Sequence, residues 1–153
     1  MAQRNTAPIV VGVDGGELGR RALAWAVEEA RRRGCPVQAI HVWAHTPVND
    51  VLLGSVRQMH EQARALLRQE VCAVTEGMEG IPEIVQECIP GTPANVLIEV
   101  AQDAAMLVLG RHRGGVARQA FIGSVSSACA RRAFCPVVVI PGPRPRRNNA
   151  AEG

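Results

Sequence analysis

Two glycine-bearing segments of the chain have the composition of a phosphate-binding site. The first, Gly12-Val13-Asp14-Gly15-Gly16, follows a run of β-branched residues, and the second extends from Gly110 to Gly123 and Ser124. Glycines let the backbone approach a phosphate closely, and backbone N–H groups can then point at its oxygens. A helix that begins near Gly123 would add its positive end, and Ser124 and Ser126 would add hydroxyl donors. The two segments therefore predict a site for an anionic ligand.

The better-known phosphate-binding motifs are absent from the sequence. The chain has no lysine, which excludes the P-loop pattern G-x-x-x-x-G-K-[ST]. The segment Gly12-Val13-Asp14-Gly15 does not fit G-x-G-x-x-G, and Asp14-Gly15-Gly16-Glu17 is only distantly similar to the S-G-G-x-D-S of PP-loop pyrophosphatases. We therefore expect a different kind of anion site.

No pattern of catalytic or metal-binding residues stands out. The five cysteines are odd in number and include no Cys-x-x-Cys, which favours free thiols over a disulfide framework. His41 and His45 lie two residues on either side of Trp43, but no third ligand is evident, so we expect a structural or exposed role for them. No G-x-S-x-G segment and no general base beside a phosphate site can be identified. We predict no catalytic residues and no metal ligands.

The elements that must position the two glycine segments alternate regularly along the chain. Short apolar runs typical of buried strands lie at 9–13, 37–42, 83–89, 106–109 and 137–140. Amphipathic helices are predicted between them at 17–33, about 55–74, 93–101 and 123–133, with Gly34 ending the first and Thr92 capping the third. This order predicts an α/β fold, a doubly wound five-stranded parallel sheet with helices on both faces. In such sheets ligands bind at the carboxyl ends of the strands, where both glycine segments lie.

The composition argues against several classes of partner. The net charge is +3, and most of it comes from the segment after Pro143, which holds three arginines and one glutamate. Nucleic-acid binding is not expected, because the positive charge does not form a basic stripe on structured elements and aromatic residues are few. No apolar run is long enough to span a membrane, and the first residues lack the apolar stretch of a secretory signal. We expect a cytoplasmic protein with one domain over residues 1–143 and a disordered Arg/Pro-rich tail over 144–153.

The same residues carry a resemblance to the universal stress protein family over about residues 7–141. The opening Val-Gly-Val-Asp-Gly and the closing Pro-Val-Val-Val-Ile-Pro are similar to the ends of that family's domain. The specific signature is a loop G-x2-G-x9-G-[ST] followed by a helix, in which Gly110 is the first position and Gly123 and Ser124 are the last. The resemblance implies strand order 3-2-1-4-5, binding of ATP either alone or with Mg²⁺, and a homodimer formed through the fifth strand at residues 137–141.

The resemblance also implies roles for individual residues. Asp14 would contact the ribose with Gly12 and Val13 beside it, and the backbone of Val42 would meet the adenine. The phosphates would be surrounded by Gly110, His112, Arg113, Gly123, Ser124, Val125 and Ser126.

The chain departs from the family's pattern at one position of the signature. Arg113 occupies the place of the second glycine, and Gly114 follows it directly. An arginine there would be strained if the backbone needs a positive φ, yet a guanidinium is also a good phosphate partner. We therefore expect an adenine-nucleotide-binding stress-response module without a dedicated catalytic site. The alternatives are an ATP-independent member that acts as a dimeric interaction protein, and a slow ATP hydrolase.

Overall fold

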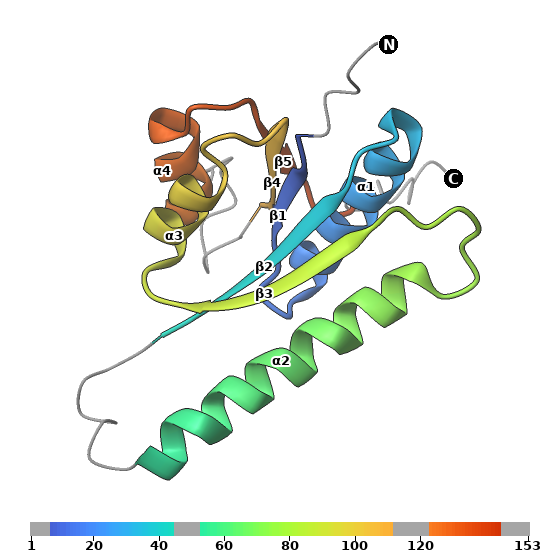
Figure 1. Ribbon diagram of the computed structural model, residues 1–153. Helices are drawn as coiled ribbons and strands as arrows, with labels where there is room; N and C mark the ends of the chain where they lie inside the picture. The colour runs from blue at the N-terminus through green and yellow to red at the C-terminus, as the bar shows by residue number, and fades with distance from the viewer. Residues whose placement is uncertain (1–6, 45–52, 112–122, 145–153) are drawn as a thin grey trace, which may run out of the picture.

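The computed structural model describes residues 7–44, 53–111 and 123–144. Within them strands and helices alternate along the chain (Figure 1). The strands are β1 (Ile9–Gly12), β2 (Val37–Trp43), β3 (Ile84–Pro90), β4 (Met106–Gly110) and β5 (Val137–Ile140). The helices are α1 (Glu17–Arg33), α2 (Leu53–Thr75), α3 (Pro93–Val100) and α4 (Ser124–Arg132).

The strands form one parallel sheet in the order β3-β2-β1-β4-β5. Both the α/β class and this strand order confirm the predictions. The innermost strands are the most apolar: Ile9, Val10 and Val11 of β1 are fully buried because helices cover both faces of the sheet. The chain adds β2 and β3 on one side of β1 and later adds β4 and β5 on the other side of β1.

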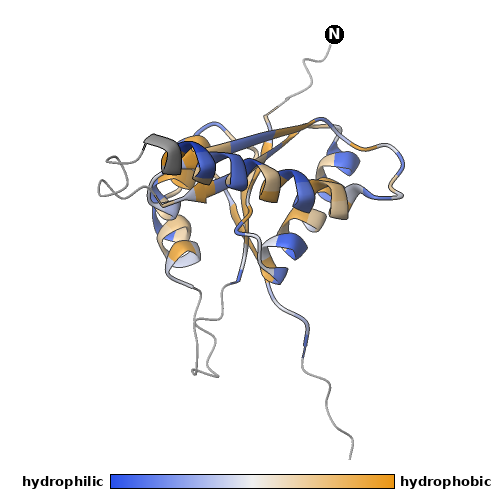
Figure 2. Ribbon diagram, turned by 90° about the horizontal axis from the view of Figure 1, so that it is seen from below, coloured by the Kyte–Doolittle hydropathy of each residue, from blue (hydrophilic) through white to orange (hydrophobic). Residues whose placement is uncertain are grey.

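Two helices pack on each face of the sheet. Core residues of α1 and α2, including Leu23 and Leu67, share one apolar cluster with the strands, whereas Leu97 of α3 and Cys129 of α4 belong to the cluster on the other face. Figure 2 shows the amphipathic character of these helices as hydrophobic and hydrophilic residues alternating along the ribbons. Among the described residues, no helix has both the length and the apolar composition that a membrane span requires.

Several predicted boundaries shift by one or two residues. The strand predicted at 9–13 ends at Gly12, although the backbone N of Val13 still donates to Ile40 O at 2.8 Å. Helix α1 ends where predicted, because Gly34 adopts the left-handed conformation with φ of 66°. Thr92 stands at the N-cap of α3 as expected, but its side chain makes no capping hydrogen bond.

Strand β3 includes Pro90, which the prediction placed in the following turn. The backbone N of Gly91 donates to Trp43 O at 3.0 Å, so position 91 faces β2 and position 90 faces away from it. Because β3 is at the edge of the sheet, the N–H that proline lacks would have had no strand partner. Proline is therefore tolerated as the last residue of this strand.

One ion pair connects the two helices on the first face. Arg20 of α1 donates from Nε and Nη2 to the two carboxylate oxygens of Glu70 of α2, both at 2.8 Å. The Glu70 side chain is only 6 % exposed, whereas that of Arg20 is 51 % exposed. Hydrogen bonding from Arg20 holds the pKa of the Glu70 carboxyl below its usual value, although burial acts in the opposite direction.

We expect Glu70→Gln to weaken the fold at neutral pH and to have less effect in acid. Because the pKa of Glu70 is lowered in the folded chain, its carboxylate stabilises the fold above the ordinary carboxyl pKa. This contribution is lost as the pH falls through the lowered value. Losing the charge-assisted bonds should cost on the order of 1–2 kcal/mol at neutral pH. Urea unfolding from neutral pH down to about pH 3 would measure the change.

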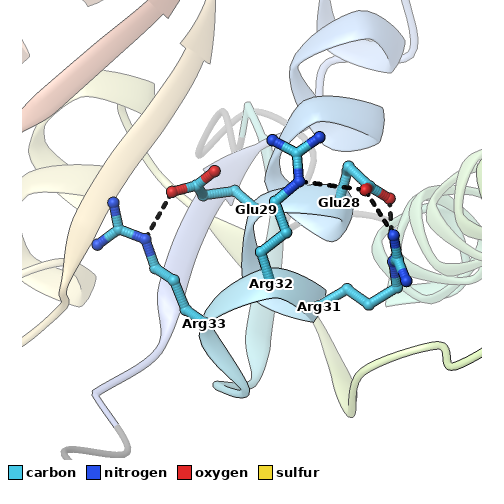
Figure 3. Close-up of polar contacts among 5 residues, drawn as sticks. All are labelled: Glu28, Glu29, Arg31, Arg32 and Arg33. Carbon is cyan, nitrogen blue, oxygen red and sulfur yellow. Dashed lines mark hydrogen bonds and ion pairs between the residues drawn. The ribbon is translucent and has the colours of Figure 1, made fainter.

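Glu28 provides the control, because it is also paired with arginine but is more exposed. Figure 3 shows Glu28 between Arg31 and Arg32 near the end of α1, with Arg31 Nη2 at 2.8 Å from its carboxylate. Its side chain is 35 % exposed, and exposed ion pairs contribute little to stability. Glu28→Gln should leave the unfolding midpoint almost unchanged. An equal loss in both variants would refute the special contribution of the buried carboxylate.

Candidate functional site

A cavity of about 370 Å³ opens at the carboxyl ends of the inner strands. It lies where β1 and β4 run side by side, so its walls come from both halves of the doubly wound sheet. Its lining residues are Gly12, Val13, Asp14, Gly19, Ile40, His41, Val42, Pro93, Leu97, Leu109, Gly110, Gly123, Ser124, Val125 and Ser126. The two glycine segments that the sequence singled out therefore meet in one place.

Asp14 lies at the start of the first glycine segment, directly after β1. The backbone N of Gly16 donates to Asp14 Oδ1 at 2.9 Å, which closes a tight turn between β1 and α1. The side chain is exposed and lines the cavity. Gly15, with φ of 86°, supplies the left-handed conformation that the turn requires. The result is a carboxylate presented at the mouth of the cavity, next to the first turn of a helix.

Gly110, at the carboxyl end of β4, lies in close contact with the backbone of α1. A Cβ at this position would overlap the backbone carbonyl of Leu18 and would lie 3.0 Å from the backbone N of Gly19. No side-chain movement could relieve that contact, because the neighbouring atoms belong to the helix backbone. Glycine at this position therefore allows α1 to approach β4 and shapes one wall of the cavity.

The amino terminus of α4 forms the opposite wall. Gly123 is the N-cap residue, no side chain caps the helix, and Gly123 through Ser126 all line the cavity. The first N–H groups of a helix have no partner within it, and the helix dipole places positive charge there. Ser126 is buried, with 2 % exposure. This end of α4 is therefore suited to hold an anionic group.

Strand β2 contributes the remaining polar lining. Val42 lies near its carboxyl end, as predicted, and lines the cavity. His41 Nδ1 lies 2.7 Å from Val13 O, so a proton on Nδ1 would be donated to that carbonyl. This hydrogen bond supports the expected structural role of His41. His45 lies outside the described residues.

Some of the predicted site residues lie outside the described residues, and some residues that line the cavity were not predicted. His112 and Arg113 lie outside the described residues, as do Arg118 and the tail from residue 145 onward. Arg111 is described, and its buried Nε has no hydrogen-bond partner among the described residues. Gly19, Ile40 and Leu97 line the cavity but were not predicted as site residues.

The described residues show no group of three or more His, Cys, Asp or Glu side chains that could hold a metal ion. All five cysteines are free thiols, and Cys72 is exposed, whereas the sequence suggested buried ones. Burial raises the pKa of Cys88, Cys129 and Cys135 above the usual value, which disfavours the reactive thiolate. Asp14 is the only carboxylate among the described residues that line the cavity. The described lining offers backbone N–H groups and serine hydroxyls as donors and one carboxylate as an acceptor.

These features define a class of protein: a doubly wound parallel α/β domain with a cavity at the switch point of its sheet, lined by parts of both glycine segments. The particular family follows from a match over residues 6–141 to the model of the universal stress protein family. The chain belongs to this family, as the motifs of the two glycine segments indicated.

Individual relatives agree with that assignment. A universal stress protein of Mycolicibacterium smegmatis is 31 % identical over 145 residues, which cover 95 % of this chain and 48 % of that protein. The chain spans about half the length of the curated relatives that it matches. Among solved structures, UspA of Lactobacillus plantarum is similar with a TM-score of 0.73 and 25 % identity, covering 88 % of this chain and 97 % of UspA.

A second solved structure was determined with a bound nucleotide. It is the universal stress protein of Archaeoglobus fulgidus in complex with dAMP, which is 26 % identical to this chain with a TM-score of 0.57. The similarity covers 87 % of this chain and 96 % of the A. fulgidus chain.

Proposed function

We propose that this chain is an adenine-nucleotide-binding module of the stress response, with ATP as its ligand either alone or with Mg²⁺. The observation that carries the proposal is the meeting of Asp14, Val42, Gly110 and the amino terminus of α4 in one cavity. The complex of the A. fulgidus relative with dAMP supports adenine nucleotides as the ligand class.

The lining residues suit the three parts of a nucleotide. The backbone of Val42 and the apolar side chains of Ile40 and Leu97 offer a surface for the base. The Asp14 carboxylate can accept hydrogen bonds from ribose hydroxyls. Backbone N–H groups at the start of α4 and the hydroxyls of Ser124 and Ser126 can donate to phosphate oxygens. We propose these as nucleotide contacts together with Gly12, Val13, Gly110, His112, Arg113, Gly123 and Val125.

Binding rather than turnover is the better proposal, because Asp14, assigned to the ribose, is the only carboxylate on the cavity wall among the described residues. A second carboxylate that could activate a water molecule beside the terminal phosphate is not found on that wall.

Titration of the purified chain with a fluorescent ATP analogue tests the proposal. Saturable binding below millimolar concentration is expected, with one site per chain, and unlabelled ATP should displace the analogue. The titration should be run with and without Mg²⁺ to determine which form binds. Absence of saturable binding up to millimolar ATP under both conditions would refute nucleotide binding.

We also propose that two copies of the chain pair through β5. This strand is at the sheet edge, its residues Val137–Ile140 are all uncharged and partly exposed, and an edge of this kind invites strand pairing. The backbone N of Arg111 donates to Ile140 O at 2.9 Å, so even-numbered residues of β5 bond to β4 and Val139 N–H faces outward. The predicted interface is residues 137–141.

A proline on the outward-facing position of β5 tests this interface. Val139→Pro removes the outward N–H but no bond to β4, so the fold should remain while the dimer dissociates. Gln86→Pro is the matched control, because residue 86 faces outward on the opposite edge strand β3. Sedimentation should show a dimer for the wild type and for Gln86→Pro, and a monomer for Val139→Pro. A wild type that sediments only as the 16.3 kDa monomer at micromolar concentration would contradict the interface.

A further inference from the structure

Gly19 lies in the first turn of α1 and is pressed against Asp14. It is buried, and it lines the cavity although it carries no side chain. A Cβ on Gly19 would overlap Asp14 Oδ1 and would lie 3.1 Å from the backbone N and 3.3 Å from Cγ of the same residue. Glycine within a helix is less favourable than alanine. The close approach to Asp14 gives a reason for tolerating that cost.

A backbone hydrogen bond also acts on the Asp14 carboxylate. The backbone N of Gly16 donates to Oδ1 at 2.9 Å, and this is the same oxygen that a Cβ on Gly19 would overlap. The turn lies close to α2, since a Cβ on Gly15 would come within 2.8 Å of Leu66 Cδ1. The Gly16 amide therefore bonds to Asp14 Oδ1, the same oxygen that a side chain at residue 19 would displace.

We propose that Gly19 is the positioning residue for Asp14, and that it sets the direction in which the carboxylate meets a hydroxyl-bearing ligand such as the ribose of a nucleotide. The inference rests on the proposed nucleotide function for its effect on affinity. The placement of the carboxylate by Gly19 is a property of the unliganded chain and does not depend on that function.

Replacement of Gly19 by alanine separates positioning from folding. Alanine favours the helical backbone, so α1 should form at least as well as in the wild type. The new methyl group would force Oδ1 away from the Gly16 amide and rotate the carboxylate. We expect ATP affinity to fall about tenfold while the circular dichroism spectrum remains that of the wild type. The 3.1 Å contact with the Asp14 backbone N should lower the unfolding midpoint somewhat, so affinity is measured well below that midpoint.

A double-mutant cycle with Asp14→Ala shows whether the two residues act as one unit. If Gly19 acts through the carboxylate, adding Gly19→Ala to Asp14→Ala should change ATP affinity less than twofold. Gly142→Ala is the matched glycine-to-alanine control, because its new Cβ would meet only Leu18 Cδ2, at 3.2 Å, and residue 142 does not line the cavity. This control should bind ATP like the wild type. Independent losses that multiply in the double variant would overturn the proposal.

The ¹⁵N–¹H resonance of Gly16 in the unliganded chain provides a readout that needs no nucleotide. In the wild type the chemical shift of this amide should show a downfield response to its hydrogen bond with Asp14 Oδ1, and the response should be lost in both Asp14→Ala and Gly19→Ala. A wild-type response in Gly19→Ala would overturn the positioning role whatever the affinities are. If the response is lost as expected but the wild type binds no ATP, the positioning role stands and the proposed function fails.

Discussion

The Asp14→Ala variant is expected to bind ATP at least tenfold more weakly than the wild type. Asp14 is the single carboxylate on the described cavity wall, and it lies beside the turn that joins β1 to α1. Removing it deletes an ionised acceptor for ligand hydroxyls. Hydrogen bonds to charged groups contribute about 1.5–3 kcal/mol, and a tenfold change in affinity corresponds to about 1.4 kcal/mol.

Folding should not account for that loss. Asp14 is exposed, and the apolar clusters on both faces of the sheet do not include it. The circular dichroism spectrum and the urea midpoint of Asp14→Ala should therefore stay close to those of the wild type. Asp103→Ala provides a matched control, since it removes the same charge from an exposed position between α3 and β4, away from the cavity. Equal weakening in both variants would assign the effect to net charge and would contradict a ribose contact at Asp14.

The sequence was sufficient for the fold because each element carries its own periodicity. The runs around Val10 and Leu107 are apolar throughout, as strands covered on both faces must be, and both residues are fully buried. In α1, Ala22, Leu23 and Ala26 recur at helical spacing and are fully buried. Strand order was less accessible from pattern alone, since pairing depends on contacts between distant segments. It came from the family resemblance, and the structure confirms it.

The sequence predicted site residues only where glycines change the backbone locally or serines supply hydroxyl groups. The glycines around Asp14 and the glycine and serines at the start of α4 are visible as interruptions of apolar runs. Ile40 and Leu97 were missed because they are ordinary core residues by type, and they reach the cavity only through the packing of β2 and α3. Gly19 did carry a signal. An isolated glycine within an amphipathic helix suggests a close packing contact.

Fold and site are linked most directly at Gly110, and we expect Gly110→Ala to have the largest effect on stability. The added Cβ would overlap the backbone carbonyl of Leu18, and the backbone N of Gly19 would lie 3.0 Å away. To accept the methyl group, the first turn of α1 must move away from β4, although fully buried residues of α1 pack on the sheet. Overpacking of this kind costs about 1–3 kcal/mol and occasionally more, and contact with backbone rather than with a side chain favours the upper end, about 3 kcal/mol.

Urea unfolding followed by circular dichroism would measure the loss, with Gly142→Ala as the matched control. A Cβ on Gly142 would also contact Leu18, but at 3.2 Å from the Cδ2 methyl of a flexible side chain, so the cost should stay below about 1 kcal/mol. Gly110 also lines the cavity, so displacement of α1 should move Asp14 and weaken ATP binding in whatever fraction remains folded. If Gly110→Ala instead proves as stable as Gly142→Ala, α1 is free to shift on the sheet. The approach of α1 to β4 would then owe nothing to the glycine at position 110.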